Sequence, residues 1–144
     1  MKLTQLLVGL VFVLVACSSS SLGLNIEPAP EEALQTAFDR YDYLLGNFAN
    51  RFPDSRAYNP DEFEIVGSQQ LNLDSDDAER NVTEQWCIVV RSLIGSGYTR
   101  RIGYGTFLVS RGEKGWSARQ MAVRVETNTV EGHTIDLWEH CLNQ

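Results

Sequence analysis

The densest group of side chains that could hold a metal ion lies at residues 74–79, with the sequence DSDDAE. Its carboxylates are the hard oxygen ligands that Ca²⁺ prefers. The EF-hand spacing needs a ligand two residues after Asp76 and then a glycine, but Ala78 and Glu79 stand there. We therefore favour a solvated acidic loop over a calcium site.

A second set of candidate ligands lies near the end of the chain, at His133, Asp136, Glu139 and His140. Imidazole and carboxylate groups suit transition metals, but the two histidines are seven residues apart and no HExxH pattern occurs. A break in regular structure is also expected between them. We expect no metal and no cofactor here, and interpret the histidines as surface or packed residues.

Patterns typical of nucleophilic catalysis and of phosphate binding are missing. The chain contains no GxSxG, and no histidine follows a cysteine in a reactive setting. The sequence Gly95-Ser96-Gly97 lacks the third glycine and the following helix that phosphate binding requires. No catalytic residue is assigned on this basis.

Aromatic side chains are numerous enough to surround a small apolar ligand. The alternative is that aromatics at these spacings simply fill the core, which is their more common role. The candidate pocket-lining residues are Tyr41, Trp86, Tyr104, Phe107, Trp116 and Trp138.

The first seventeen residues have the features of a secretory leader. Lys2 is followed by an apolar run of about ten residues, too short for a permanent membrane span, and by Ala16 and Cys17. The sequence Leu14-Val15-Ala16-Cys17 resembles the lipobox of bacterial lipoproteins. The resemblance implies that residues 1–16 are a removable signal peptide and that Cys17 carries lipid such as palmitate. The alternatives are an ordinary signal peptide or an uncleaved anchor.

Residues 17–29 contain serines, a glycine and two prolines without periodicity, which predicts a flexible lipid-anchored tether. The resemblance places the protein in the cell envelope. Ser18, in place of an aspartate, implies the outer membrane facing the periplasm if the cell is Gram-negative. Otherwise the location would be the outer face of the plasma membrane.

Two cysteines remain if Cys17 is acylated. In an oxidising compartment an even number favours a disulfide, so we expect a bond between Cys87 and Cys141. The alternative is a thiol pair for redox chemistry or metal, but the chain has no CxxC.

These side chains would be positioned by one long helix and a sheet. Apolar residues recur at three- and four-residue spacing from Leu34 to Phe48, and prolines at 28, 30 and 53 flank them. This pattern predicts an amphipathic helix over residues 30–50.

Alternating and continuous β-prone stretches follow the helix. We predict strands near 62–67, 84–94, 98–110 and 115–126, separated by glycine-rich turns. The run from Trp86 to Val90 should be central and covered on both faces. Residues 134–142 fit either a helical turn or a short edge strand.

One helix followed by an antiparallel meander predicts a single α+β domain at residues 30–144, with the long N-terminal helix packed on a curled antiparallel sheet of about four strands. The order of elements over residues 30–126 resembles cystatin-like and NTF2-like domains. NTF2-like domains can enclose a pocket, which the resemblance would allow here.

Charge is distributed unevenly along the chain. The net charge is −7, so binding to nucleic acid is excluded as a function. Residues 27–84 hold fourteen acids and four arginines, whereas residues 85–144 hold five acids and seven bases. The helix side should be strongly acidic, for solubility or for docking a basic partner.

We therefore expect a lipid-anchored envelope protein whose body is a noncatalytic binding or assembly module, with the membrane and another envelope protein as partners. The alternative is an NTF2-like pocket domain for a small apolar ligand, less readily an enzyme. A cystatin-like protease inhibitor is disfavoured because the Gln-Val-Val-Ala-Gly loop is missing.

Overall fold

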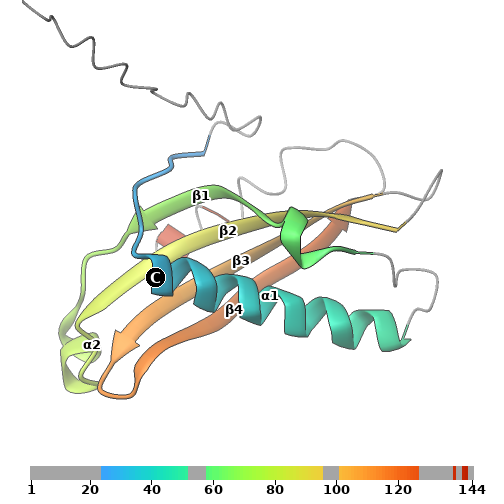
Figure 1. The fold of residues 1–144 in the computed structure, drawn as a ribbon. Coiled ribbons are helices and arrows are strands. Elements are labelled where there is room, and N and C mark those ends of the chain that lie inside the picture. Colours follow the sequence, from blue (N-terminus) through green and yellow to red (C-terminus); the bar gives the residue numbers. More distant parts are fainter. Residues whose placement is uncertain (1–23, 52–57, 96–100, 127–137, 139–140, 143–144) are drawn as a thin grey trace, which may run out of the picture.

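The computed structural model describes residues 24–51, 58–95, 101–126, 138 and 141–142 (Figure 1). Among these residues one long helix precedes an antiparallel sheet, which confirms the expected α+β fold class. The elements are α1 (Glu31–Arg51), η2 (Pro60–Glu62), β1 (Glu64–Gln70), α2 (Ser75–Glu79), β2 (Glu84–Ile94), β3 (Arg101–Gly112) and β4 (Gly115–Glu126).

Helix α1 starts directly after Pro30, one residue later than predicted. The carbonyl of Pro30 accepts hydrogen bonds from the backbone N–H groups of Ala33 and Leu34, at 3.0 and 3.1 Å. Glu31 and Glu32 occupy the first turn, where negative charge is favourable. The fully buried side chains recur every fourth residue and form the stripe that faces the sheet: Ala33, Ala37, Tyr41 and Leu45.

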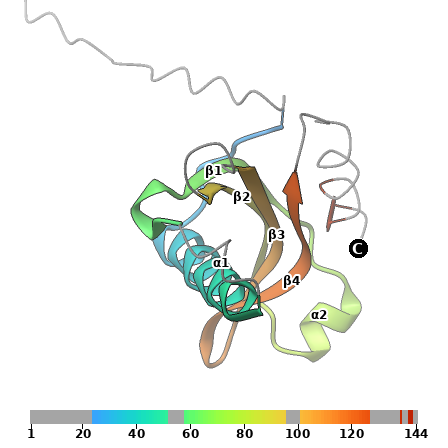
Figure 2. The same cartoon turned by 90° about the vertical axis from the view of Figure 1, so that its right-hand side faces the viewer.

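The four strands form a meander in the order β1-β2-β3-β4, and every neighbouring pair is antiparallel. Figure 2 shows the sheet curved around α1. The observed β2 and β4 have the predicted bounds. Strand β1 starts two residues later than predicted, because Asn59 caps the short helix η2. Strand β3 reaches Gly112, two residues beyond the prediction, and residues 98–100 lie outside the described part.

Each face of the sheet has its own core. We call the face covered by α1 the inner face; its core includes Trp86, Ile88 and Phe107. The opposite, outer face has a core that includes Val89 and Leu108. Because alternate residues of β2 enter the two cores, this strand is buried on both sides, as its sequence predicted.

The expected disulfide between Cys87 and Cys141 is present, with a Cα–Cα distance of 5.9 Å. It ties the end of the chain to the outer face, where Trp138 is buried. Trp138, Cys141 and Leu142 have helical backbone, so for these residues the helical alternative is correct.

The predicted tether, residues 17–29, is too long at its C-terminal end, because residues 24–29 belong to the folded body. Ser68 of β1 donates its backbone N–H to the carbonyl of Asn25 at 2.9 Å, and its carbonyl accepts from Glu27 at 2.8 Å. Leu24 is buried in the outer core. The burial of the Leu24 side chain and these two hydrogen bonds fix a segment whose composition predicted a flexible chain. Residues 17–23 are outside the described part.

No helix within the described ranges is both long enough and apolar enough to span a membrane.

Candidate functional site

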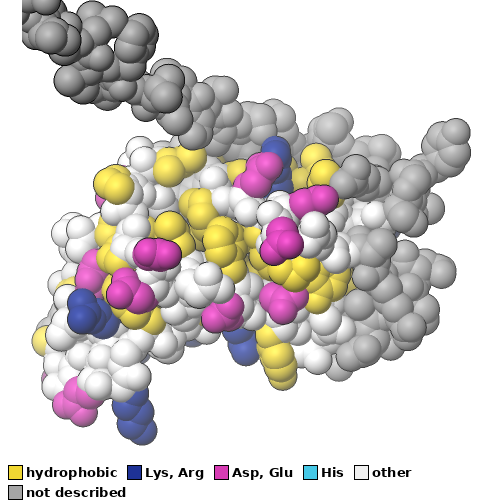
Figure 3. Space-filling view, in the orientation of Figure 1, with side chains coloured by type: hydrophobic (Ala, Val, Ile, Leu, Met, Phe, Trp, Pro, Cys, Tyr) yellow, Lys and Arg dark blue, Asp and Glu magenta, His cyan; other side chains and the backbone are white. Residues whose placement is uncertain are grey.

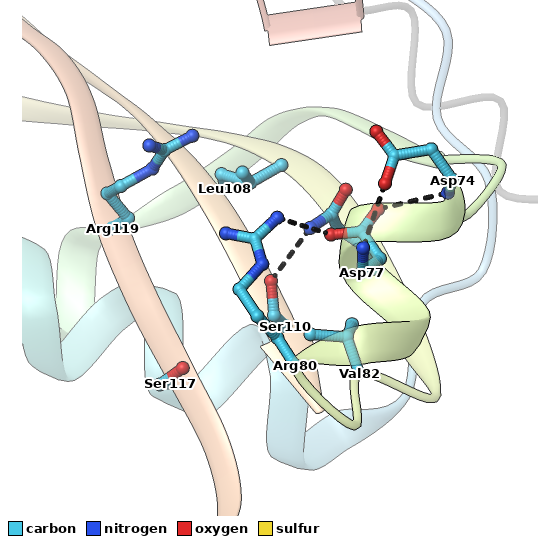
Figure 4. A pocket seen from close by; sticks show the side chains of 9 residues that line it. Asp74, Asp77, Arg80, Val82, Leu108, Ser110, Ser117 and Arg119 are labelled. Carbon is cyan, nitrogen blue, oxygen red and sulfur yellow. Dashed lines mark hydrogen bonds and ion pairs between the residues drawn. The ribbon is translucent and has the colours of Figure 1, made fainter. Parts of the chain in front are cut away.

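A hollow of about 370 Å³ opens on the outer face, between α2 and the strands β2 to β4 (Figure 4). We call it the outer hollow. Three segments of the chain meet there: α2 with its flanking residues, the start of β2, and the hairpin of β3 and β4. Its lining consists of Asp74, Asp77, Arg80, Val82, Gln85, Leu108, Ser110, Ser117 and Arg119.

One wall is built by α2, where the sequence predicted a solvated acidic loop. That prediction is wrong, because two of the carboxylates serve as helix caps. The Asp74 side chain accepts a hydrogen bond from the Asp77 backbone N–H at 2.8 Å, and Asp77 Oδ2 accepts from the Asp74 N–H at 3.2 Å. This reciprocal capping box satisfies N–H groups that a helix start leaves unpaired.

Asp77 is also the anchor of an ion pair. Its Oδ1 atom lies 2.9 Å from an Arg80 guanidinium nitrogen, while the Asp77 side chain is 6% exposed and that of Arg80 is 66% exposed. The buried Asp77 carboxylate therefore fixes the position of the Arg80 side chain, which is itself exposed to solvent.

The opposite wall and the floor come from the sheet. Gln85 donates from Nε2 to Ser110 Oγ at 3.1 Å. The strand register pairs Leu108 with Arg119 and Ser110 with Ser117, so these side chains share the outer face. In Figure 4 the side chains of Arg80 and Arg119 extend into the hollow from α2 and from β4.

The formal charges of the lining balance, because the carboxylates of Asp74 and Asp77 stand with the guanidinium groups of Arg80 and Arg119. Guanidinium groups bind carboxylates with strong, directional hydrogen bonds, and the serine hydroxyls and the amide of Gln85 add further polar groups. No group of three or more metal-ligating side chains occurs within the described ranges. The outer hollow therefore offers hydrogen-bond donors and acceptors of both charges.

The six aromatic residues predicted to line one pocket do not lie together. Tyr41, Trp86, Phe107 and Trp116 belong to the inner core, whereas Tyr104 and Trp138 belong to the outer core. The two groups are separated by the sheet, because side chains along a strand alternate between its faces. None of the six lines the outer hollow.

Tyr41 is held inside the inner core by one polar contact. Its hydroxyl lies 2.9 Å from Ser92 Oγ, and both residues are buried. Burial raises the pKa of Tyr41 to about 12, although the hydrogen bond to Ser92 acts in the opposite direction. The tyrosine is neutral at physiological pH and acts as a packed residue.

A second hollow, of about 380 Å³, lies between η2 and β2. It is lined by Asp61, Glu62, Phe63, Glu64, Arg91, Ser92 and Leu93. Arg91 pairs with Glu64 at 2.5 Å. This surface adjoins α1, and Figure 3 shows acidic side chains distributed over that side of the molecule.

Cys17 and the candidate ligands His133, Asp136, Glu139 and His140 lie outside the described residues. The predictions of lipidation at Cys17 and of no metal at the histidines therefore remain predictions. The bond between Cys87 and Cys141 is the one predicted chemical feature that the described part contains.

The arginines of the outer hollow were missed by the sequence analysis. Arg80 and Arg119 are 39 positions apart, and they meet only because the end of α2 lies beside β4 in the folded chain. The spacing of Asp74 and Asp77 was a usable signal for the capped helix.

Comparisons with protein-family models, with curated proteins and with solved structures found no match for this chain.

Proposed function

We propose that this chain is a lipid-anchored protein of a bacterial cell envelope, whose folded body binds another envelope protein and does not catalyse a reaction. The anchor would be Cys17, after removal of residues 1–16. The location would be the outer membrane in a Gram-negative cell, and the outer face of the plasma membrane otherwise.

The anchor is supported by the lipobox-like sequence ending at Cys17 and by the place where the folded body begins. Leu24 is buried in the outer core and follows Cys17 by seven residues. Seven extended residues reach at most about 25 Å. A lipid on Cys17 would therefore keep the body close to the bilayer, within reach of other envelope proteins.

The binding role rests on one observation: the aromatic side chains that could have formed a ligand pocket fill two separate cores. A Cβ atom added to Gly105 would lie 2.7 Å from Tyr41 Cδ2 and 2.7 Å from Phe107 Cε2, which leaves no room for a ligand at that point. An interior this dense favours action at the surface. A filled interior disfavours the alternative of an apolar pocket domain.

The anchor is tested by replacing the acylated atom. We expect the Cys17→Ser variant to lose incorporation of an alkyne-labelled palmitate analogue and to leave the detergent phase on partitioning. A Ser18→Ala variant is the matched control and should behave as the unchanged protein. Labelling of Cys17→Ser at the level of the control would contradict the lipid anchor.

The choice between surface binding and an apolar pocket is tested with a hydrophobic fluorescent probe. We expect the native full chain in detergent to give no more probe fluorescence than the detergent alone. Saturable binding that Phe107→Leu alters would support a pocket instead and would contradict the binding module.

A further inference from the structure

The second hollow, between η2 and β2, forms where β1 is shorter than its neighbour. Glu64, the first residue of β1, pairs with Arg91, so β2 continues past it over residues 92–94. The short helix η2 precedes β1 and packs against this end of β2. The space left between them measures about 380 Å³ and is large enough to hold one long side chain.

The formal charges of this hollow do not balance, in contrast to those of the outer hollow. Its lining has the carboxylates of Asp61, Glu62 and Glu64 against the single guanidinium of Arg91. Arg91 is already paired with Glu64. Asp61 is exposed, and no ion pair within the described ranges involves it. A cation that enters the hollow would therefore meet an excess of negative charge.

The same hollow has an apolar part, formed by Phe63 and Leu93. Leu93 is 37% exposed. Three other rings hold the half-buried Phe63 in place, with ring centroids between 5.0 and 6.1 Å from its own: Phe38, Tyr41 and Tyr58. A guanidinium group can stack on an aromatic ring and bond a carboxylate at once, while its aliphatic stem packs on apolar surface. These features fit an arginine side chain.

The acidic character continues from this hollow onto α1. Phe38 of α1 contacts the Phe63 ring, so this turn of the helix adjoins the hollow. Asp39 is exposed, and Asp42 Oδ1 accepts a hydrogen bond from the Tyr58 hydroxyl at 2.9 Å. Neither carboxylate belongs to an ion pair of the described residues. Figure 3 shows acidic side chains around the hydrophobic ones on this side of the molecule, which favours a positively charged segment as the occupant.

We propose that the second hollow binds an arginine side chain in a basic segment of a partner protein. This inference rests on the proposed protein-binding function and names its surface and the chemistry of its partner. Asp61 would accept hydrogen bonds from the guanidinium group, and Phe63 and Leu93 would contact the rest of the side chain. A second copy of this chain is a poorer occupant, because each copy carries a net charge of −7.

The probe is a short glycine- and serine-based peptide with a lysine near each end and one arginine at its centre. Matched peptides carry lysine or citrulline at the centre; citrulline has nearly the shape of arginine but no charge. Binding to the full chain in neutral detergent is measured by fluorescence anisotropy. We expect the arginine peptide to bind on the order of tenfold more tightly than the citrulline peptide and about threefold more tightly than the lysine peptide. An arginine peptide that binds no better than either of the others would overturn the proposal.

The site is located with the variant Asp61→Asn. Glu113→Gln, in the exposed turn between β3 and β4, is the control with the same loss of charge. Both residues are exposed, so we expect neither change to alter thermal unfolding measurably. We expect on the order of a tenfold loss of arginine-peptide affinity for Asp61→Asn and less than about twofold for Glu113→Gln. Equal losses would contradict a site at Asp61.

The surface is separated from the binding function by crosslinking. A photoreactive amino acid at Leu93 in the full chain, in lysed cells that produce it, should capture a partner protein that the arginine peptide displaces and the citrulline peptide does not. Capture from Ser117 and not from Leu93 would leave the binding function standing and overturn the second hollow as its surface. Capture of a second copy of this chain from Leu93 would overturn the basic partner.

Discussion

The two faces of this sheet are covered in different ways. The inner face is closed by one continuous helix of 21 residues, whose stripe of small and aromatic side chains packs along the strands. The outer face is covered in pieces: Leu24, helix α2, and the tail that includes Trp138 and Cys141. The inner core is filled under this helix, whereas the outer face keeps the outer hollow where α2 meets the strands.

The largest difference between the faces should appear when the disulfide is removed. Cys87 and Cys141 are 54 positions apart, and a bridge over that length stabilises by about 4 kcal/mol in the chain-entropy model. We expect the double variant Cys87→Ala/Cys141→Ala to lose about 2–5 kcal/mol in urea unfolding. Hydrogen exchange should rise first in the tail and not in α1. If backbone amides of α1 lost protection from hydrogen exchange before those of the tail, the idea that the two faces are covered independently would be contradicted.

Added volume should be tolerated less well on the inner face than on the outer face. A methyl group at Gly105 would stand 2.7 Å from atoms of Tyr41 and Phe107, and one at Gly67 would stand 3.1 Å from atoms of Leu24 and Trp138. We expect Gly105→Ala to cost about 1–3 kcal/mol, as overpacking does. Gly67→Ala should cost less than about 1 kcal/mol, because the short covering pieces can shift. Thermal unfolding of both variants measures this, and the reverse order would contradict the comparison.

The cover formed by α2 should depend on its caps. Loss of the Asp74 side chain leaves the Asp77 N–H without its acceptor, and caps of this type contribute about 1 kcal/mol. We expect Asp74→Ala to destabilise by about that amount and to speed hydrogen exchange within α2. The neighbouring exposed residue gives the control: Asp76→Ala should change stability by less than about 0.5 kcal/mol. Equal effects would contradict the capping role.

The smallest effect concerns alkaline pH. Burial raises the pKa of Tyr41 to about 12, and burial together with Asp42 raises that of Tyr58 to about 12, from ordinary values near 10. The folded protein holds the two phenol protons more tightly than the unfolded chain does. Their contribution to the free energy of unfolding is therefore fully present below pH 10 and is lost as the pH rises toward 12. We expect an absorbance titration to show two tyrosines that ionise well above pH 10. One of these transitions should be missing in Tyr41→Phe and the other in Tyr58→Phe. Both ionising near pH 10 would contradict this.

The sequence was a better guide to the inner face than to the outer face, for a physical reason. The periodicity of α1 and the continuous β-prone run around Ile88 are local patterns, so the helix and the central strand could be predicted from neighbouring residues. The outer hollow depends on which residue of β3 lies opposite which residue of β4. That register, which pairs Leu108 with Arg119, includes an irregularity at Thr106/Phe107 that no local pattern indicated.

Helix α2 and residues 24–29 were missed for a related reason. A five-residue helix is too short for a periodic stripe, and its capping residues Asp74 and Asp77 resembled an acidic loop. Leu24 stands in a serine- and proline-rich stretch, and its burial depends on a contact with the distant outer core. The disulfide could be predicted because only two cysteines remain when Cys17 is set aside, which leaves a single pairing within the chain.

The central claim is that the folded body has a filled interior and acts by binding at its surface. Photoreactive amino acids placed at Ser117 on the outer face and at Asp39 on α1, both exposed, test this directly in the full chain within the cells that produce it. We predict that at least one of the two positions captures a partner protein, and that the native chain takes up no hydrophobic probe. No capture from either position, together with saturable binding of the probe, would contradict the account.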